Sequence, residues 1–109
     1  MKRGDVVLAV ASGDYGKPRP ALVVQSDYFN PTHASLTVCP ITSELIDARL
    51  FRLPVEPGPT NGLRKRSQIM VDKIQSLRRA RVRSVVGRLT AKQLGEVDGA
   101  LRLWLGLQP

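Results

Sequence analysis

Short apolar runs separated by turn-forming residues fill the first two-thirds of the chain. The runs lie at 6–11, 21–24, 36–41, 50–55, 68–77 and 82–86, with glycine, proline, aspartate and asparagine between them. Runs of strand length at a spacing of about ten residues are typical of small all-β folds. The segment 57–62 combines proline-fixed φ angles with an Asn-Gly pair, which predicts a chain reversal. The pattern therefore predicts a small antiparallel barrel or sandwich.

The end of the chain changes to the period of a helix. Apolar residues recur there at spacings of three and four, at Leu94, Val97, Leu101 and Leu105. Thr90 and Gln93 have the spacing of a capping box, in which hydroxyl and amide satisfy unpaired backbone N–H groups. Trp104 borders the apolar face, and Gly106 is a typical helix end. We therefore predict one amphipathic helix over 91–105, packed on the barrel or on a partner subunit.

Length and composition indicate a single folded domain, 1–109. The 109 residues, 42% of them apolar, are enough for one hydrophobic core. Cys39 is the only cysteine, which excludes a disulfide scaffold, and only His33 joins it as a soft ligand, which excludes a structural zinc site. A lone thiol is typical of a cytoplasmic protein. No apolar stretch approaches the roughly 20 residues of a membrane span.

Positive charge dominates and is concentrated in one part of the sequence. The 17 Lys and Arg residues outnumber the 9 Asp and Glu residues, which gives a net charge of +8. Between Glu56 and Glu96 the only acid is Asp72, and the bases are Arg64, Lys65, Arg66, Lys73, Arg78, Arg79, Arg81, Arg83, Arg88 and Lys92. Such a field suits a polyanion, either nucleic acid or an acidic protein tail. A membrane surface fits less well, because these charges do not follow an amphipathic helix. The alternative is a solvated basic surface that keeps the protein in solution.

The inventory of side chains excludes several catalytic mechanisms. A ribonuclease with paired imidazoles needs two histidines, and this chain has one. Two-metal nucleases need converging carboxylates, whereas the acids here are scattered. No glycine-rich phosphate loop precedes a helix, and Cys39 has no charged sequence neighbour that would activate its thiol. What remains is a site without metal or cofactor, built from arginine, hydroxyl and carboxylate groups.

Arg19 stands out because it lies between two prolines, in the segment Gly-Lys-Pro-Arg-Pro at 16–20. A residue before proline is held in an extended conformation, so this guanidinium is carried on stiff backbone at the entrance of a strand. It is well placed to grip a phosphate by a bidentate contact. The spacing equally allows a structural salt bridge to Asp5, Asp14 or Asp27.

Five segments of the chain resemble the MazF/PemK toxin family, in the family's order. They are 3–7, 16–27, 38–43, 62–74 and the closing helix, so the resemblance covers essentially the whole chain. It implies a small SH3-like β-barrel with a C-terminal helix, in a homodimer. It also implies a metal-independent endoribonuclease that cleaves single-stranded RNA, usually mRNA, at short motifs. The expected products are a 2′,3′-cyclic phosphate and a 5′-hydroxyl end.

The resemblance also implies which residues act. The family's functional arginine falls on Arg19, its functional threonine on Thr42, and an acid late in a following strand on Asp72. Arg19 is expected to clamp the scissile phosphate, Thr42 to hydrogen-bond it, and Asp72 to accept the 2′-hydroxyl proton. Some members carry an arginine two residues before this acid, where this chain has Met70, which cannot donate a proton. The residues expected to contact the RNA are Lys17, Tyr15, Ser43, Arg64, Lys65, Ser67 and Lys73.

The resemblance implies macromolecular partners as well. In the family the RNA groove runs along the homodimer interface, and a cognate MazE-like antitoxin with an acidic tail inhibits the toxin, with DNA contact expected through the antitoxin complex. Two other functions fit the same features. One is a CcdB-like toxin that inhibits DNA gyrase without enzymatic activity. The apolar end of the chain, 104–109, favours this alternative. The other is a basic nucleic-acid-binding module without catalysis.

Overall fold

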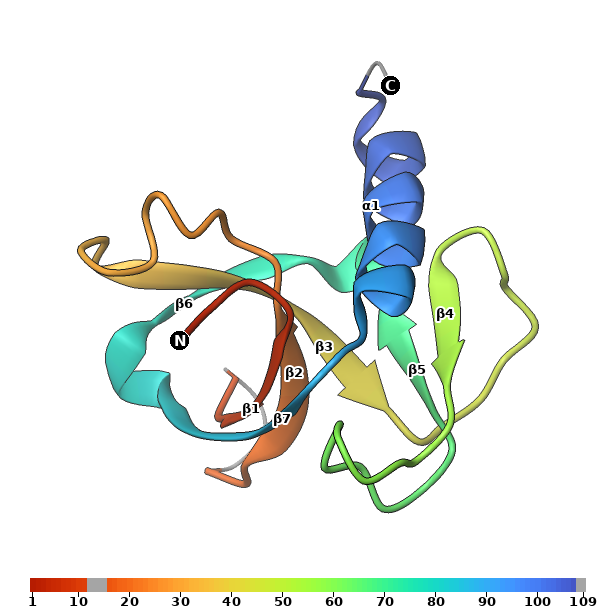
Figure 1. Ribbon diagram of the computed structural model, residues 1–109, viewed down its shortest axis with the longest axis horizontal. Coiled ribbons are helices and arrows are strands. Elements are labelled where there is room, and N and C mark those ends of the chain that lie inside the picture. Colours follow the sequence, from red (N-terminus) through yellow and green to blue (C-terminus); the bar gives the residue numbers. More distant parts are fainter. Residues whose placement is uncertain (12–15, 108–109) are drawn as a thin grey trace.

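The computed structural model describes residues 1–11 and 16–107. These residues contain seven antiparallel strands, two short 3₁₀ turns and one α-helix. The elements are β1 (Asp5–Ala9), β2 (Arg19–Val23), β3 (Ser35–Thr42), β4 (Arg52–Val55), β5 (Ser67–Met70), η1 (Val71–Lys73), β6 (Gln75–Arg78), η2 (Arg79–Arg81), β7 (Val82–Arg88) and α1 (Ala91–Leu105). The strand order is β4-β5-β3-β2-β1-β7, and β6 also pairs with β3. Figure 1 shows the sheet curled on itself with α1 at one side. This agrees with the predicted antiparallel barrel and C-terminal helix.

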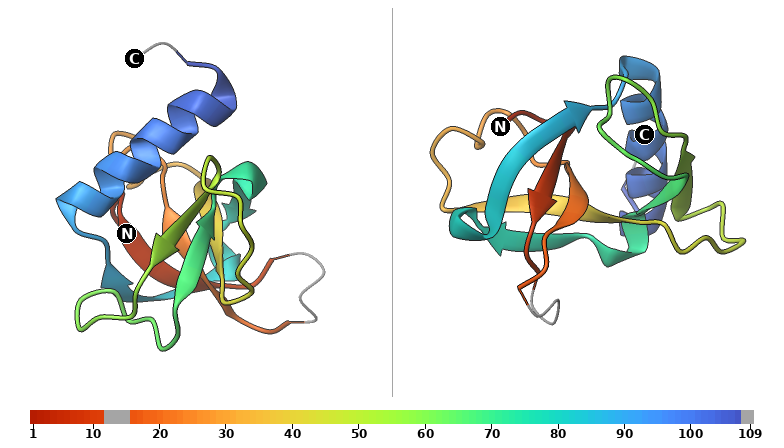
Figure 2. Two further views of the ribbon diagram at one scale, coloured as in Figure 1. Left: turned by 90° about the vertical axis from the view of Figure 1, so that its right-hand side faces the viewer. Right: turned by 90° about the horizontal axis from the view of Figure 1, so that it is seen from below.

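The central strands β1, β2 and β3 are buried on both faces over most of their length, which explains why their apolar runs in the sequence are continuous. Successive side chains of a strand point to opposite faces. In β1, Val6 therefore belongs to one apolar cluster, shared with Val97 of α1, whereas Val7 and Ala9 belong to a second cluster inside the curled sheet. The two views of Figure 2 show α1 against the first face, beside β4 and β5. Strict alternation would have exposed one of the two faces to solvent.

The apolar run 68–77, predicted as one strand, is two strands in the structure. β5 ends at Met70, the 3₁₀ turn η1 follows, and β6 starts at Gln75. The eight-residue strand β3 is long enough to pair with both: its residues 35–38 bind β6 and its residues 41–42 bind β5. The turn lets the chain pass from one partner segment of β3 to the other.

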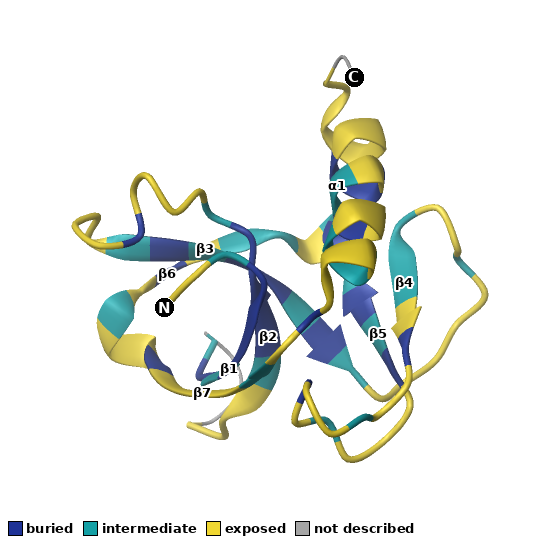
Figure 3. Ribbon diagram, viewed as in Figure 1, coloured by how far each residue is buried: buried dark blue, intermediate teal, exposed yellow. Residues whose placement is uncertain are grey.

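Helix α1 is delimited by the residues that the sequence indicated. The Thr90 hydroxyl accepts a hydrogen bond from the Gln93 N–H, the Gln93 side chain accepts one from the Thr90 N–H, and Gly106 is left-handed at the C-cap. The buried face consists of Val97, Ala100 and Leu101. Leu105, expected on that face, is 50% exposed because the helix runs past the edge of the sheet. Figure 3 shows the outward side of α1 as exposed.

The predicted chain reversal at 57–62 is held together by one buried amide. The Asn61 side chain accepts hydrogen bonds from the backbone N–H groups of Gly58 and Leu63 at 3.1 and 3.0 Å, and it donates one to the Glu56 carbonyl at 2.9 Å. These three bonds fix the path of the loop between β4 and β5. The loop therefore holds the residues that follow it, 63–66, at a defined place beside the sheet.

No helix within the described ranges is both long and apolar enough to cross a membrane.

Candidate functional site

A row of polar residues crosses the sheet near one end of its central strands. The antiparallel register pairs Ala9 with Arg19 and Thr42 with Gln68. β2 and β3 pair Ala21 with Pro40, so the same register continued by two residues sets Arg19 opposite Thr42. Directly opposed side chains of an antiparallel pair point to the same face and lie about 5 Å apart at Cβ. This register directs both residues to the same end of the sheet, and both line one groove, although 22 residues separate them in the sequence.

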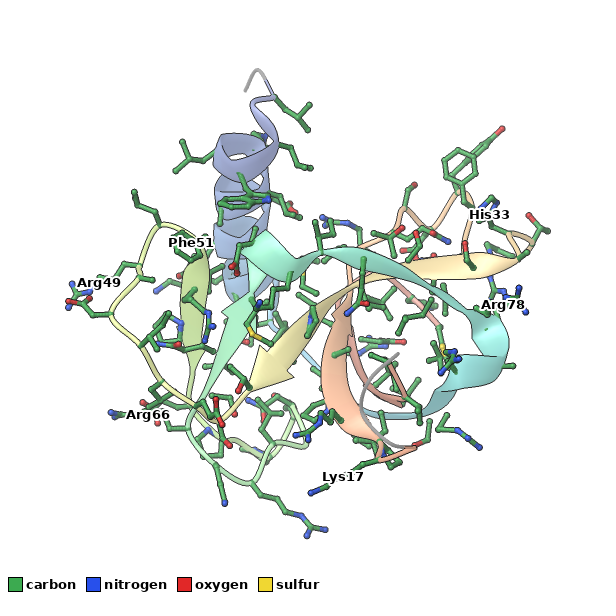
Figure 4. All side chains as sticks on the ribbon, turned by 180° about the vertical axis from the view of Figure 1, so that it is seen from behind. Lys17, His33, Arg49, Phe51, Arg66 and Arg78 are labelled. Carbon is green, nitrogen blue, oxygen red and sulfur yellow. The ribbon has the colours of Figure 1, made fainter. Side chains whose placement is uncertain are left out.

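These side chains lie in an open groove of about 970 Å³. Eight of the residues predicted for the site line it: Lys17, Arg19, Thr42, Ser43, Arg64, Lys65, Ser67 and Lys73. They come from the start of β2 and the segment before it, the end of β3 and the residue after it, the β4–β5 loop, β5 and η1. Figure 4 shows the side chains from behind, with Lys17 projecting at the lower edge of the molecule. The groove therefore gathers residues from distant parts of the sequence into one basic surface.

The hydroxyl groups of the groove are held by the local backbone. The Thr42 hydroxyl accepts a hydrogen bond from the Glu44 N–H at 3.0 Å, which leaves its own proton available to a ligand. The Ser67 hydroxyl instead donates to the Lys65 carbonyl at 2.8 Å, and Ser67 is 5% exposed. Thr42 is thus the better placed donor of the two, and Ser67 also braces the β4–β5 loop.

The groove contains two charged residues that the sequence analysis did not select, Arg52 and Glu44. Arg52 lies directly across the β4–β5 ladder from Met70. Its NH1 group donates to the Glu44 carbonyl and to the Gln68 side chain, each at 3.3 Å. A guanidinium therefore lies in the groove beside the methionine where some members of the resembled family have an arginine. The signal was the lone arginine that interrupts the apolar run 50–55.

Glu44 is the single acid among the described residues that line the groove, where six side chains are cationic: Lys17, Arg19, Arg52, Arg64, Lys65 and Lys73. Its backbone is fixed on both sides, because its N–H binds the Thr42 hydroxyl and its carbonyl accepts from Arg52. An anionic ligand in this groove meets a strongly positive field with one carboxylate in it.

Asp72 is not among the residues that line the groove. It lies in η1 with one carboxylate oxygen, Oδ1, buried and without a hydrogen-bond partner in the described part of the chain. Burial raises the pKa of the Cys39 thiol to about 12, with Arg3 lowering it and Asp72 contributing to the rise. The carboxylate of Asp72 thus lies within electrostatic range of the buried thiol. Its role in proton transfer stays a prediction, and Cys39 is a core residue rather than a nucleophile.

Two further predictions concern residues or groups at the margin of the site. Tyr15, expected as a stacking platform for RNA bases, lies outside the described residues. Within the described ranges, no three or more His, Cys, Asp and Glu side chains are grouped so that they could hold a metal ion.

A curled antiparallel sheet, a C-terminal helix and a groove of guanidinium, ammonium and hydroxyl groups define a class: small β-barrel proteins with a cationic groove. Residues 2–105 match the family model described as "PemK-like, MazF-like toxin of type II toxin-antitoxin system". The chain is also 44% identical over 108 residues to "Probable endoribonuclease MazF" of Mycolicibacterium smegmatis, with 98% of each chain covered. The chain therefore belongs to the PemK/MazF family of type II toxins.

Solved structures agree with this assignment at the level of the fold. The "Mycobacterium tuberculosis toxin MazF-mt6" superposes with a TM-score of 0.83 at 24% identity, covering 96% of this chain and 99% of that one. A crystal structure of MazE-MazF from Deinococcus radiodurans superposes with a TM-score of 0.81 at 25% identity, covering 99% and 97%.

Proposed function

We propose that this chain is the toxin of a type II toxin–antitoxin system and cleaves single-stranded RNA in the cytoplasm without a metal ion. The observation that carries the proposal is that Arg19 and Thr42 line the same strongly basic groove. The relative from Mycolicibacterium smegmatis is named a probable endoribonuclease, which supports the activity. Single-stranded RNA is the polyanion that supplies its own nucleophile, the 2′-hydroxyl, beside each phosphate.

In the proposed reaction the 2′-oxygen attacks the phosphorus and the bond from phosphorus to the 5′-oxygen breaks. One proton leaves the 2′-hydroxyl and one joins the departing 5′-oxygen, so the products are a 2′,3′-cyclic phosphate and a 5′-hydroxyl. Arg19 neutralises the charge that develops on the phosphate oxygens, which is commonly the largest contribution to such catalysis. The Thr42 hydroxyl donates to one of those oxygens. Guanidinium is a poor proton donor, because the pKa of arginine exceeds about 12, so the leaving oxygen takes its proton from solvent.

The acceptor of the 2′-hydroxyl proton is a carboxylate in this proposal. Asp72 is the residue that the family resemblance assigns, but Glu44 is the acid that lines the groove beside Thr42. Glu44 is therefore the favoured acceptor. Arg52 assists by holding the Glu44 backbone and by adding a second guanidinium near the phosphate. This fits the presence of methionine at position 70.

The proposed partners follow from the same groove. The Deinococcus radiodurans structure contains a complex named MazE-MazF, which supports an antitoxin partner for this chain. A peptide with an acidic tail would compete with RNA for the six cationic side chains of the groove. A homodimer would bring two such grooves together on one particle.

The test is RNA cleavage by purified variants, each checked by circular dichroism for folding. We expect Arg19→Gln and Thr42→Val each to lower kcat by about 10²–10³-fold, as loss of one transition-state donor does. Thr42→Ser keeps the hydroxyl and is the matched control. Loss of the proton acceptor costs about 10²–10⁴-fold, so Glu44→Gln compared with Asp72→Asn identifies which carboxylate acts. Chelation by EDTA should leave the rate unchanged.

Several results would overturn the proposal. Full cleavage by folded Arg19→Gln and Thr42→Val would remove the site assignment, and inhibition by EDTA would indicate a metal nuclease. Salt-sensitive RNA binding without product would indicate a binding module without catalysis. Inhibition of DNA gyrase by a protein that leaves RNA intact would indicate a gyrase toxin.

A further inference from the structure

A second hollow adjoins the groove along strand β6. It has a volume of about 750 Å³ and is formed by β6, η2, the start of β7 and Val10, the residue that follows β1. Gln75 and Leu77 line both the groove and this second hollow, so the two are neighbours across one strand. We call the second hollow the arginine cleft, because three of its lining residues are Arg78, Arg81 and Arg83 and none of its described lining residues is acidic.

The arginines in and beside the cleft differ in whether they make hydrogen bonds within the protein. Arg79 donates from Nε to the His33 carbonyl at 2.5 Å and also to the Asn30 carbonyl, so it fastens the β2–β3 loop. Arg81 reaches the Val10 carbonyl at 3.5 Å. Arg78 and Arg83 are exposed, and no hydrogen bond or ion pair within the described ranges holds their guanidinium groups. Two guanidinium groups in the cleft are thus available to a ligand.

We propose that the arginine cleft binds the phosphodiester backbone of the RNA strand where it leaves the cleavage groove, an inference that rests on the proposed function. Lys73 lines the groove, Arg78 lines the cleft, and Gln75 and Leu77, which lie between them in the sequence, line both. Residues 75 to 78 lie in an extended strand, which spans about 10 Å. One path for a polymer longer than its cleavage motif therefore runs from the groove along β6 to the cleft.

The chemistry of the cleft suits phosphate in particular. Guanidinium is planar and binds a phosphate by two parallel hydrogen bonds. Contacts of this kind position a nucleic acid without reading its bases. The cleft should therefore affect how tightly long RNA binds, and it should leave the cleavage motif and the chemical step unchanged.

The test compares a short RNA, confined to the cleavage motif, with RNAs extended on the 5′ or the 3′ side. The variant is Arg78→Gln/Arg83→Gln. The matched control is Arg49→Gln/Arg102→Gln, which removes the same charge from exposed positions that line neither hollow. Figure 4 shows Arg49 and Arg78 at opposite edges of the molecule.

For one of the extended RNAs we expect the cleft variant to raise KM without changing kcat, and to leave the short RNA unaffected. Single-stranded contacts contribute about 0.7 per phosphate to the salt slope. Loss of two contacts should lower the slope by about 1.4, so the wild-type advantage shrinks about sevenfold between 50 and 200 mM salt. The control should follow the wild type in both respects.

Equal KM values for the cleft variant and the control on every extended RNA would overturn the inference. So would a cleft variant that loses binding to a poly-glutamate peptide but keeps its affinity for extended RNA, a result that assigns the cleft to an acidic protein. Cleavage of the short RNA by the wild type reports on the proposed function separately. If no RNA is cleaved, fluorescence anisotropy with the extended RNAs still compares the cleft variant with the control.

Discussion

The β4–β5 loop and strand β7 approach so closely that two glycines have no room for a methyl group. A Cβ atom at Gly62 would lie 2.3 Å from the Val86 carbonyl oxygen, and one at Gly87 would lie 2.3 Å from the Asn61 carbonyl carbon. Neither backbone segment can easily move away from the added methyl group, because hydrogen bonds hold both. The Arg88 N–H donates to the Thr60 carbonyl at 2.8 Å, and the Asn61 side chain is tied to the loop backbone. The substitutions Gly62→Ala and Gly87→Ala therefore test whether this contact holds the loop.

The expected magnitudes follow from two physical costs. Overpacking costs about 1–3 kcal/mol, and it applies at both positions. Gly62 also has a φ of +71°, a left-handed conformation that costs alanine about 1–2 kcal/mol more. We expect a loss of about 2–5 kcal/mol for Gly62→Ala and about 1–3 kcal/mol for Gly87→Ala. At about 4 °C per kcal/mol for a domain of this size, Tm falls by roughly 8–20 °C and 4–12 °C.

The assay is thermal unfolding followed by circular dichroism, with Gly95→Ala as the matched control. Gly95 is an exposed helical residue, and a Cβ atom added there would have no heavy atom within 4 Å beyond its own helix backbone and chain neighbours. Alanine there should gain about 0.5–1 kcal/mol, because glycine is costly inside a helix. A Tm for Gly62→Ala at or above that of the wild type would refute the reasoning. Since the loop carries Arg64 and Lys65 into the groove, the destabilised variants should also bind RNA less tightly.

Two further predictions concern the ends of the fold. The hydrogen bond from the Arg3 N–H, and after it the one from the Asn30 side chain, hold the pKa of Asp27 below its ordinary value of 3.8. The ionised carboxylate therefore stabilises the folded protein above pH 3.8, and this stabilisation is lost as the pH falls through the lowered pKa. Urea unfolding should show Asp27→Asn less stable than the wild type at neutral pH but less sensitive to acid below pH 3.8, and parallel pH profiles would contradict this. Thr90→Ala removes the capping box of α1 and should cost about 1 kcal/mol in denaturant unfolding, whereas Thr90→Ser should cost much less; equal losses for both would show that the hydroxyl is not the stabilising group.

The strands could be predicted from the sequence because turn residues delimit them, and α1 because its capping residues flank an apolar period. The division of 68–77 into two strands could not. The turn begins at Val71, which is apolar like Ile69 and Met70 before it, and it arises because β3 pairs with both β5 and β6. Pairing of one strand with two segments is a long-range requirement, and the β-propensity of the local residues does not reveal it.

Sequence order also hides which members of a group act together. Arg78, Arg79 and Arg81 form one basic run in the sequence. Arg78 is the last residue of β6 and η2 spans Arg79–Arg81, so the run is divided between a strand and a 3₁₀ turn and its side chains leave the backbone in different directions. Arg78 and Arg81 accordingly line the arginine cleft, whereas Arg79 binds the carbonyls of the β2–β3 loop. A charge count assigns all three to a ligand, and only the backbone geometry separates the structural arginine from the others.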